Sequence, residues 1–98
     1  MIIAISFNEF AEKELNESAD YYEFQVKGLG ITFLAEVERS IKLIQQNPES
    51  FSPVLKVVRR KILRRFPYSI MFSFVDNSIR ILAIANHKRR PYYWRGRN

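Results

Sequence analysis

The residues of this chain that are able to do chemistry are basic and aromatic, and they gather in two segments of its second half. The first is KVVRRKILRRF (residues 56–66), and the second is NHKRRPYYWRGRN (residues 86–98), which holds the only histidine. Clustered arginine and lysine side chains bind phosphate or carboxylate groups. His87 follows directly after an apolar run, and a histidine in a basic setting is either a general base or a structural, solvated side chain.

Several other kinds of active site are absent from the sequence. Without cysteine there is no disulfide framework, no thiol nucleophile and no cysteine-based metal site. The single histidine leaves no histidine cluster for zinc, and there is no glycine-rich phosphate-binding loop. Asp76 is the only carboxylate among residues 51–98, so no acid–base pair of carboxylates is expected there. We therefore expect neither a metal nor a cofactor.

The charged residues divide unequally between the two halves of the chain. Residues 1–50 hold four basic and nine acidic side chains, whereas residues 51–98 hold twelve basic side chains and one acidic, and the formal net charge is +6. This asymmetry predicts a positive lobe that favours nucleic acid or an acidic protein as partner. The apolar runs are far shorter than the roughly 20 residues that span a bilayer, so no membrane partner is expected.

The pattern of apolar residues predicts the elements that must position these groups. A short apolar run at residues 2–7 is typical of a strand, and spacings of three and four then predict two helices within residues 8–46. Residues 57–66, 68–75 and 79–86 predict three strands, and the nearly continuous apolarity of the last favours a central place in the sheet. The expected fold is α+β in the order β-α-α-β-β-β, with an antiparallel sheet of three or four strands and an N-terminal helical hairpin packed on one face. We expect one domain, residues 1–98.

Each basic segment also admits a structural interpretation. Charged side chains on an edge strand prevent aggregation between sheets, but residues 56–65 carry six of them, more than that role needs. Trp94 and its neighbouring tyrosines could stack on unpaired bases. The only tryptophan of a small domain is usually largely buried, so we expect Trp94 to be a structural anchor that packs against the sheet.

The chain resembles the RelE/ParE superfamily of type II toxin–antitoxin toxins over nearly its whole length. The resemblance rests on the β-α-α start and on the segments NPESF, VRRKILRRFPYSIMF and ILAIANHKRRPYYW. Two details are similar to the ParE-like, or plasmid-stabilisation, branch. One is the Arg-Phe-Pro-Tyr sequence at residues 65–68, and the other is the pattern of His87, Arg90 and Trp94, with the usual proline displaced by one position to Pro91.

This resemblance implies a small cytoplasmic toxin that inhibits growth and is neutralised by a cognate antitoxin, which we expect to be acidic and to fold on binding. ParE-like members are linked to poisoning of DNA gyrase, whereas RelE-like members cleave messenger RNA on the ribosome. The nuclease pattern has an arginine just after the tyrosine that opens the third strand, and here that position is Ser69. Its C-terminal aromatic is a tyrosine, and here it is Trp94. Both departures favour gyrase as the target.

Three functions remain as hypotheses. The preferred one is a non-enzymatic toxin that binds DNA gyrase and blocks replication. The alternatives are a ribosome-dependent mRNA endoribonuclease and a plain nucleic-acid-binding module. The predicted target-binding patch consists of Arg59, Arg60, Arg64, Arg65, His87, Arg89 and Arg90. For a nuclease, the candidate catalytic residues are Arg60, Lys61, His87 and Arg90.

Overall fold

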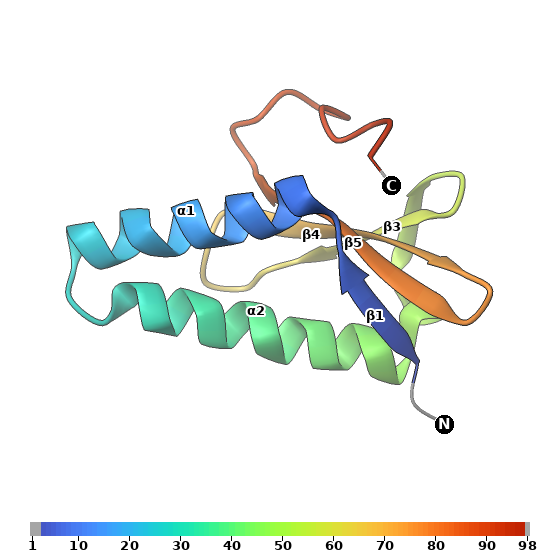
Figure 1. Ribbon diagram of the computed structural model, residues 1–98, viewed down its shortest axis with the longest axis horizontal. Helices are drawn as coiled ribbons and strands as arrows, with labels where there is room; N and C mark the ends of the chain where they lie inside the picture. The colour runs from blue at the N-terminus through green and yellow to red at the C-terminus, as the bar shows by residue number, and fades with distance from the viewer. Residues whose placement is uncertain (1–2, 98) are drawn as a thin grey trace.

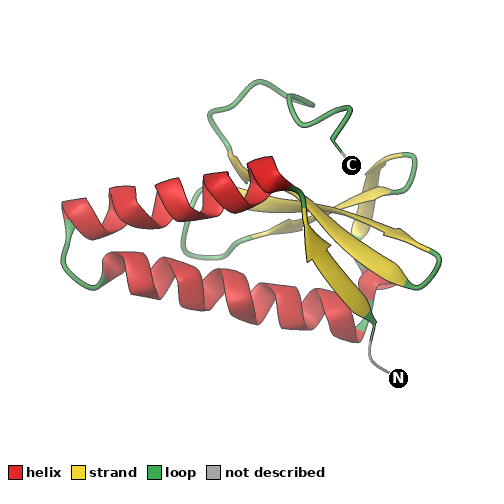
Figure 2. Cartoon of the chain, in the orientation of Figure 1, coloured by secondary structure: helices red, strands yellow, loops and turns green. Residues whose placement is uncertain are grey.

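A computed structural model describes residues 3–97 and shows a five-stranded sheet with two helices on one of its faces (Figure 1). In chain order the elements are β1 (Ala4–Phe7), α1 (Glu9–Gln25), α2 (Leu29–Gln46), the 3₁₀ helix η1 (Pro48–Ser50), β2 (Ser52–Leu55), β3 (Val58–Ile62), β4 (Tyr68–Val75) and β5 (Ser78–Asn86). The strands lie in the order β1-β5-β4-β3-β2. Beyond β5 the chain has no further helix or strand within the described residues, and it folds back as a series of turns (Figure 2). No helix within residues 3–97 has the length and apolarity needed to cross a membrane.

Local sequence signals begin the first helix and join it to the second. The Asn8 side chain accepts a hydrogen bond from the backbone N–H of Phe10 at 2.8 Å, so it caps one of the free donors at the start of α1. Between the helices Gly28 has a φ of 87°, a conformation that glycine adopts without strain. A Cβ atom at Gly30 would lie 2.5 Å from the carbonyl oxygen of Ala19, so glycine is required where the two helices touch. These features make the two helices an antiparallel hairpin.

β5 has one more residue than β4 over their paired length, and it packs on both of its faces. β4 and β5 pair in antiparallel register, but the register shifts by one residue between the pairs Met71–Ala83 and Phe72–Ile81. The extra residue is Leu82, which forms a β-bulge. The bulge keeps the isoleucines of β5 on the side of the helices and directs Leu82 and Ala83 to the opposite side. Both faces of β5 are covered, so its sequence lacks polar alternation.

The sheet therefore separates two hydrophobic clusters. On the helix side the rings of Phe33, Phe66 and Tyr68 meet edge to face, and the Phe33 ring centroid lies 5.0 Å from each of the other two. On the opposite side, which we call the open face, Trp94 packs with Met71 and the bulged part of β5. The open face is covered only by the C-terminal segment, defined here as residues 87–97, within the part of the chain that the structure describes.

The structure confirms the α+β fold, the helical hairpin on one face and the central place of the last strand. The expectation of a purely antiparallel sheet is wrong, because β1 pairs in parallel with β5, from Ala4 opposite Ser78 to Phe7 opposite Ile81. β1 leads into a helix and not into a tight turn, so its partner is a strand distant in sequence and local patterns do not specify it.

The sheet also has five strands where three or four were expected. The additional strand is β2, which precedes the basic strand and pairs with it in antiparallel register. β2 is short and contains Pro53, and both features weaken the sequence signal of a strand. Its place at the edge of the sheet is one where proline is tolerated, because an edge strand does not need every backbone N–H for pairing.

Candidate functional site

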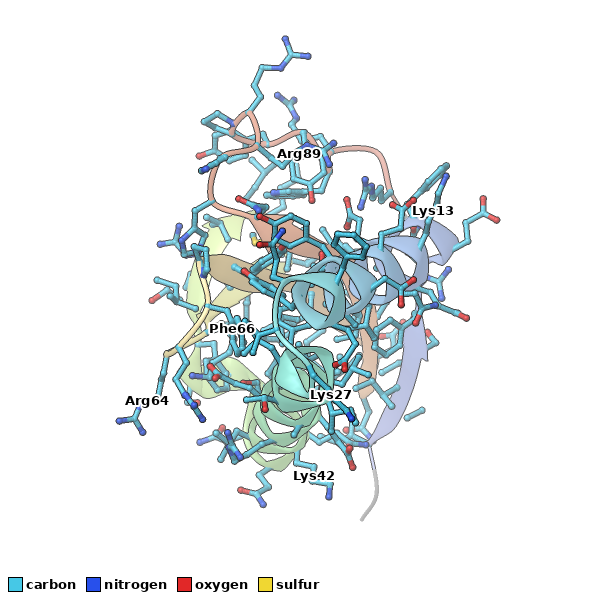
Figure 3. All side chains as sticks on the ribbon, turned by 90° about the vertical axis from the view of Figure 1, so that its left-hand side faces the viewer. Lys13, Lys27, Lys42, Arg64, Phe66 and Arg89 are labelled. Atoms are coloured by element: carbon cyan, nitrogen blue, oxygen red, sulfur yellow. The ribbon has the colours of Figure 1, made fainter. Side chains whose placement is uncertain are left out.

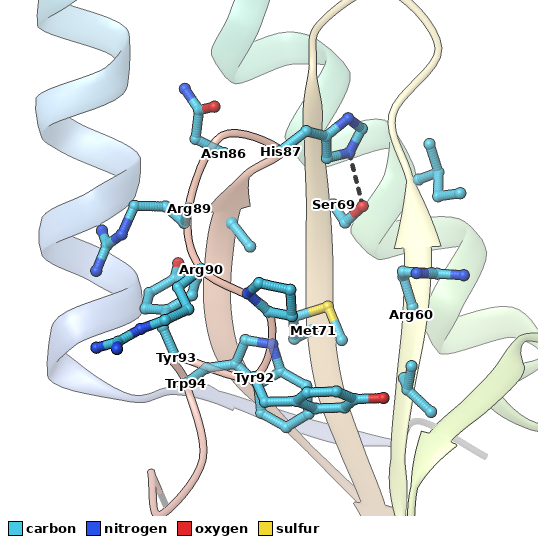
Figure 4. Close-up of a pocket in the computed structure, with 14 residues that line it drawn as sticks. Arg60, Ser69, Met71, Asn86, His87, Arg89, Arg90, Tyr92, Tyr93 and Trp94 are labelled. Carbon is cyan, nitrogen blue, oxygen red and sulfur yellow. Dashed lines mark hydrogen bonds between the residues drawn. The ribbon is translucent and has the colours of Figure 1, made fainter.

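A pocket of about 400 Å³ opens on the open face of the sheet, beside the C-terminal segment (Figure 4). Strands β3 and β4 form one side of it, and the C-terminal segment forms the other. The side chains of chemical interest in its lining are Arg60, Ser69, His87, Arg90, Tyr92 and Trp94. The two basic segments of the sequence therefore meet at one site, although 19 residues (67–85) lie between them in the chain.

Ser69 and His87 form a hydrogen-bonded pair in this pocket. The Ser69 Oγ and His87 Nε2 atoms are 2.9 Å apart, and Ser69 is buried whereas His87 is exposed. The backbone N–H of His87 donates to the carbonyl oxygen of Pro67 at 2.8 Å, which fixes the start of the C-terminal segment against the β3–β4 loop. Within residues 3–97 no carboxylate bonds to His87, so the pair lacks the third group that orients the imidazole in a hydrolase triad.

Arg60 and Arg90 are the cations of the pocket whose charge is not used inside the protein. Both side chains are exposed, and neither has a hydrogen bond or an ion pair within the described residues. Arg60 lies opposite Met71 in the sheet, and the Met71 side chain packs on the open face, so Arg60 points to the same side. Guanidinium groups without an internal partner are available for a carboxylate or a phosphate of another molecule.

The structure places the remaining predicted basic residues in other surroundings. Arg59 and Lys61 alternate with Arg60 along β3 and lie on its helix side, where Arg59 donates to the backbone carbonyl of residue 51 at 2.7 Å. Arg64 and Arg65 belong to the β3–β4 loop and are not part of the pocket lining. Figure 3 shows Arg64 and Arg89 in separate parts of the molecule. The residues that the pocket brings together are Arg60, His87, Arg89 and Arg90.

Trp94 lies where the pocket meets the hydrophobic cluster of the open face. Its side chain belongs to the same cluster as Met71, Leu82 and Ala83, and the residue is only 5% exposed. The indole centroid lies 5.7 Å from the ring centroid of Tyr92, which is half-exposed on the wall of the pocket. Burial of Trp94 thus links the C-terminal segment to the two central strands of the sheet.

A second attachment of the C-terminal segment comes from Glu14 of α1, which the sequence analysis did not identify. The Glu14 carboxylate accepts hydrogen bonds from the Tyr93 hydroxyl at 2.8 Å and from the Arg97 guanidinium at 2.9 and 3.1 Å. The guanidinium of Arg89 lies 3.7 Å from the same carboxylate and stacks on the Tyr93 ring, 3.8 Å from its centroid. Burial, and then the hydrogen bond to Glu14, raise the pKa of Tyr93 above its usual range. These four residues are called the clasp below.

Two residues of the clasp, Glu14 and Arg97, also form hydrogen bonds with the backbone of the sheet. Pairing between β1 and β5 ends at Ile81, which leaves the next part of β5 without a neighbouring strand on that side. There Glu14 accepts from the backbone N–H of Ile84 at 3.0 Å, and Arg97 donates to the carbonyl oxygen of Leu82 at 3.0 Å. An ion pair of side chains thus takes the place of a strand's backbone groups.

A sequence signal for Glu14 existed but was weak. Glu14 comes three residues after Ala11 and one before Leu15, so it lies beside the apolar stripe of the first helix and not on its outer face. A carboxylate at such a position needs a partner when the helix packs. No group of three or more histidine, aspartate or glutamate side chains with the arrangement of a metal site occurs in residues 3–97.

Comparison with known proteins finds similarity among solved structures. No protein-family model matches the sequence, and a search of curated proteins gives no significant match. Among solved structures, a chain from the "Chromosomal ParDE TA system from P. aeruginosa" superposes with a TM-score of 0.73 and 21% sequence identity, over 87% of this chain and 96% of that chain. The chain has the fold of this ParDE protein. The resemblance inferred from the sequence is thereby confirmed at the level of the fold.

Within this ParDE-like fold, the pocket combines groups suited to binding an anionic partner. Arg60 and Arg90 supply positive charge that has no partner within the described part of the chain, and Tyr92 supplies an exposed aromatic face. Ser69 and His87 add hydrogen-bonding groups between these cations, and the roles of donor and acceptor depend on which nitrogen of His87 carries the proton. The arrangement favours recognition of a carboxylate-rich or phosphate-rich surface.

Proposed function

We propose that this chain is the toxin of a type II toxin–antitoxin pair and that it inhibits growth by binding DNA gyrase in the cytoplasm. The observation that carries the proposal is the likeness of its fold to a chain of the ParDE system. Binding to gyrase requires a surface and no chemistry from the toxin. The guanidinium groups of Arg60 and Arg90, which have no partner among residues 3–97, and the exposed ring of Tyr92 provide such a surface. The cognate antitoxin is expected to be acidic and to fold on binding.

One observation favours a second candidate, a ribosome-dependent endoribonuclease. Cleavage of RNA by its own 2′-hydroxyl needs a base to remove the proton and cations to stabilise the charge that develops on the phosphate. The pair of Ser69 and His87, 2.9 Å apart, lies in the same pocket as Arg60 and Arg90. Ser69 is buried, and His87 has no carboxylate partner among residues 3–97, so this candidate is second to gyrase binding.

Charge reversal in the pocket tests the proposed surface. We expect Arg60→Glu and Arg90→Glu each to abolish growth inhibition on induced expression, because each replaces an unpaired cation of the pocket by an anion. Arg64→Glu is the matched control, since it makes the same charge change outside the pocket. Circular dichroism of the purified variants verifies the fold. Full toxicity of both pocket variants, or equal loss in the control, would contradict a role for the pocket.

Assays with purified components separate the candidate targets. Inhibition of gyrase supercoiling by the wild-type chain, and not by Arg60→Glu, is the expected result. Cleavage of messenger RNA only in the presence of translating ribosomes would establish the nuclease instead, and then His87→Ala should remove it. Binding to nucleic acid alone, with a steep dependence on salt and no effect on gyrase or ribosomes, would support a plain nucleic-acid-binding module.

A further inference from the structure

The wall of the pocket that carries Arg90 and Tyr92 has no regular secondary structure of its own. It consists of successive turns, and Tyr92 has a φ of 61°, a left-handed conformation that is strained for a residue with a side chain. Such a conformation persists only where the surrounding structure holds it. The two residues that follow Tyr92 are the ones that hold it here. Tyr93 is bonded to Glu14, and Trp94 is buried on the open face.

Glu14 accepts the hydrogen bonds that tie the C-terminal segment to the first helix. Both of its oxygens accept hydrogen bonds, and their donors are Tyr93, Arg97 and a backbone N–H of β5. Its side chain and that of Arg97 are only 13% and 14% exposed, so solvent does little to weaken their ion pair. One carboxylate of α1 thus joins the helix, the sheet and the C-terminal segment.

We propose that Glu14 is a positioning residue for the pocket. It holds the C-terminal segment in the arrangement that places Arg90 and Tyr92 in the lining of the same pocket as Arg60. Glu14 is not part of the pocket lining, so it acts on the target only through this segment. The inference rests on the proposed function, because it concerns the same target-binding surface.

Charge alone makes the opposite prediction, which gives the proposal a sharp test. Neutralising any glutamate makes this basic protein more positive, and an acidic or polyanionic target would then bind as tightly or more tightly. Positioning by Glu14 predicts weaker binding in spite of the added positive charge. The sign of the change in affinity therefore distinguishes positioning from net charge.

Glutamine at position 14 has nearly the shape of glutamate but cannot replace it. The amide has one acceptor oxygen and one NH₂ group, whereas every neighbour of the carboxylate here is a donor. The Tyr93 hydroxyl can rotate to accept a hydrogen bond, but the Arg97 guanidinium and the backbone N–H of Ile84 have no acceptor to offer. Glu14→Gln should therefore loosen the segment with little change in volume.

The experiment compares Glu14→Gln with Glu17→Gln, which makes the same charge change at an exposed position on the same helix. Affinity for purified DNA gyrase is measured below the melting temperature of each variant. Quenching of Trp94 fluorescence by acrylamide reports the C-terminal segment without any target, since Trp94 is the only tryptophan. Tyr93→Phe, which removes one hydroxyl and no charge, serves as a milder second variant.

We expect Glu14→Gln to bind gyrase at least about tenfold more weakly than wild type, the scale of one lost charge-assisted hydrogen bond, and its Trp94 to be more accessible to acrylamide. Glu17→Gln should bind gyrase as tightly as wild type or more tightly, with unchanged quenching. For Tyr93→Phe we expect an affinity and a degree of quenching between those of Glu14→Gln and wild type. Equal or tighter binding by Glu14→Gln, or quenching equal to that of Glu17→Gln, would overturn the inference. Failure of the wild type itself to bind gyrase would reject the proposed function, and the quenching comparison would still decide whether Glu14 holds the segment.

Discussion

Replacement of Trp94 by alanine should destabilise the whole protein, because Trp94 is the main side chain that covers the open face. An aromatic side chain buries about 150–250 Å², which at about 25 cal/mol per Å² corresponds to about 4–6 kcal/mol. Replacing an aromatic residue of a core by alanine costs about 3–5 kcal/mol. Trp94 borders a pocket into which its neighbours can relax, so we expect a loss near 3 kcal/mol. For a chain of 98 residues this lowers the melting temperature by roughly 10–25 °C.

Thermal and urea unfolding followed by far-ultraviolet circular dichroism measure this loss without relying on tryptophan fluorescence. Phe24→Ala is the control, because Phe24 is 90% exposed and its removal should change the free energy of unfolding by no more than about 0.5 kcal/mol. Growth inhibition by Trp94→Ala should fall at least as far as the folded fraction falls, because Trp94 also holds the wall of the pocket. A variant that melts like wild type, keeps slow hydrogen exchange in residues 87–97 and yet is harmless would show that Trp94 contacts the target and is not an anchor.

Partial detachment of the C-terminal segment would give a different result from global destabilisation. If this segment opens independently of the sheet, the loss on removing Trp94 cannot exceed the free energy of that local opening. The melting temperature would then change little, while hydrogen exchange in residues 87–97 would become faster. This outcome would refute the argument that Trp94 couples the segment to β4 and β5.

Two further predictions concern groups inside the fold. Glu36 is 4% exposed and accepts hydrogen bonds from the backbone N–H groups of Arg64 at 2.6 Å and Arg65 at 3.2 Å. Glu36→Ala should therefore lower the free energy of unfolding by about 2–3 kcal/mol in urea titrations. Glu38→Ala, at an exposed position, is the control and should change it by less than about 0.5 kcal/mol. Equal effects of the two substitutions would contradict the role of Glu36. Burial, with a smaller contribution from Tyr68, raises the pKa of Tyr22 to about 12. Because Tyr22 ionises first in the unfolded chain, near pH 10, its contribution to stability is constant below that pH and is lost as the pH rises towards 12. Tyr22→Phe should therefore make the fall in stability over this range less steep.

The elements that the sequence predicted are those specified by contacts near in the chain. The helical hairpin follows from apolar spacing and the glycines between the helices, and the β4–β5 hairpin follows from two apolar runs around a short turn. The parallel pairing of β1 with β5 depends on residues more than 70 positions apart, so no local pattern reports it. The bulge at Leu82 was hidden for another reason, because an apolar residue on either face of a doubly covered strand looks the same in sequence.

The functional site was predictable only where its residues lie close together in the chain or follow the alternation of a strand. His87 and Arg90 are neighbours in the chain, and alternation along β3 separates Arg60 from Arg59 and Lys61. Whether the side of β3 with Arg60 or the side with Arg59 and Lys61 would face the pocket depended on the path of the C-terminal segment. That segment consists of turns, and turns carry little periodic signal. Glu14 depended on that path as well, since its partners are some 80 residues away.

The ion pair that replaces a strand beside β5 bears on the solubility of the protein. The stretch ILAIA, at residues 81–85, is apolar, uncharged and free of proline, a composition typical of segments that aggregate as stacked strands. β4 protects one side of it, but past Ile81 the other side is a sheet edge that, among residues 3–97, is closed by the side chains of Glu14 and Arg97. A chain in which this pair separates exposes a strand edge that another copy can extend. We therefore expect variants that lose this ion pair to yield less soluble protein on overexpression.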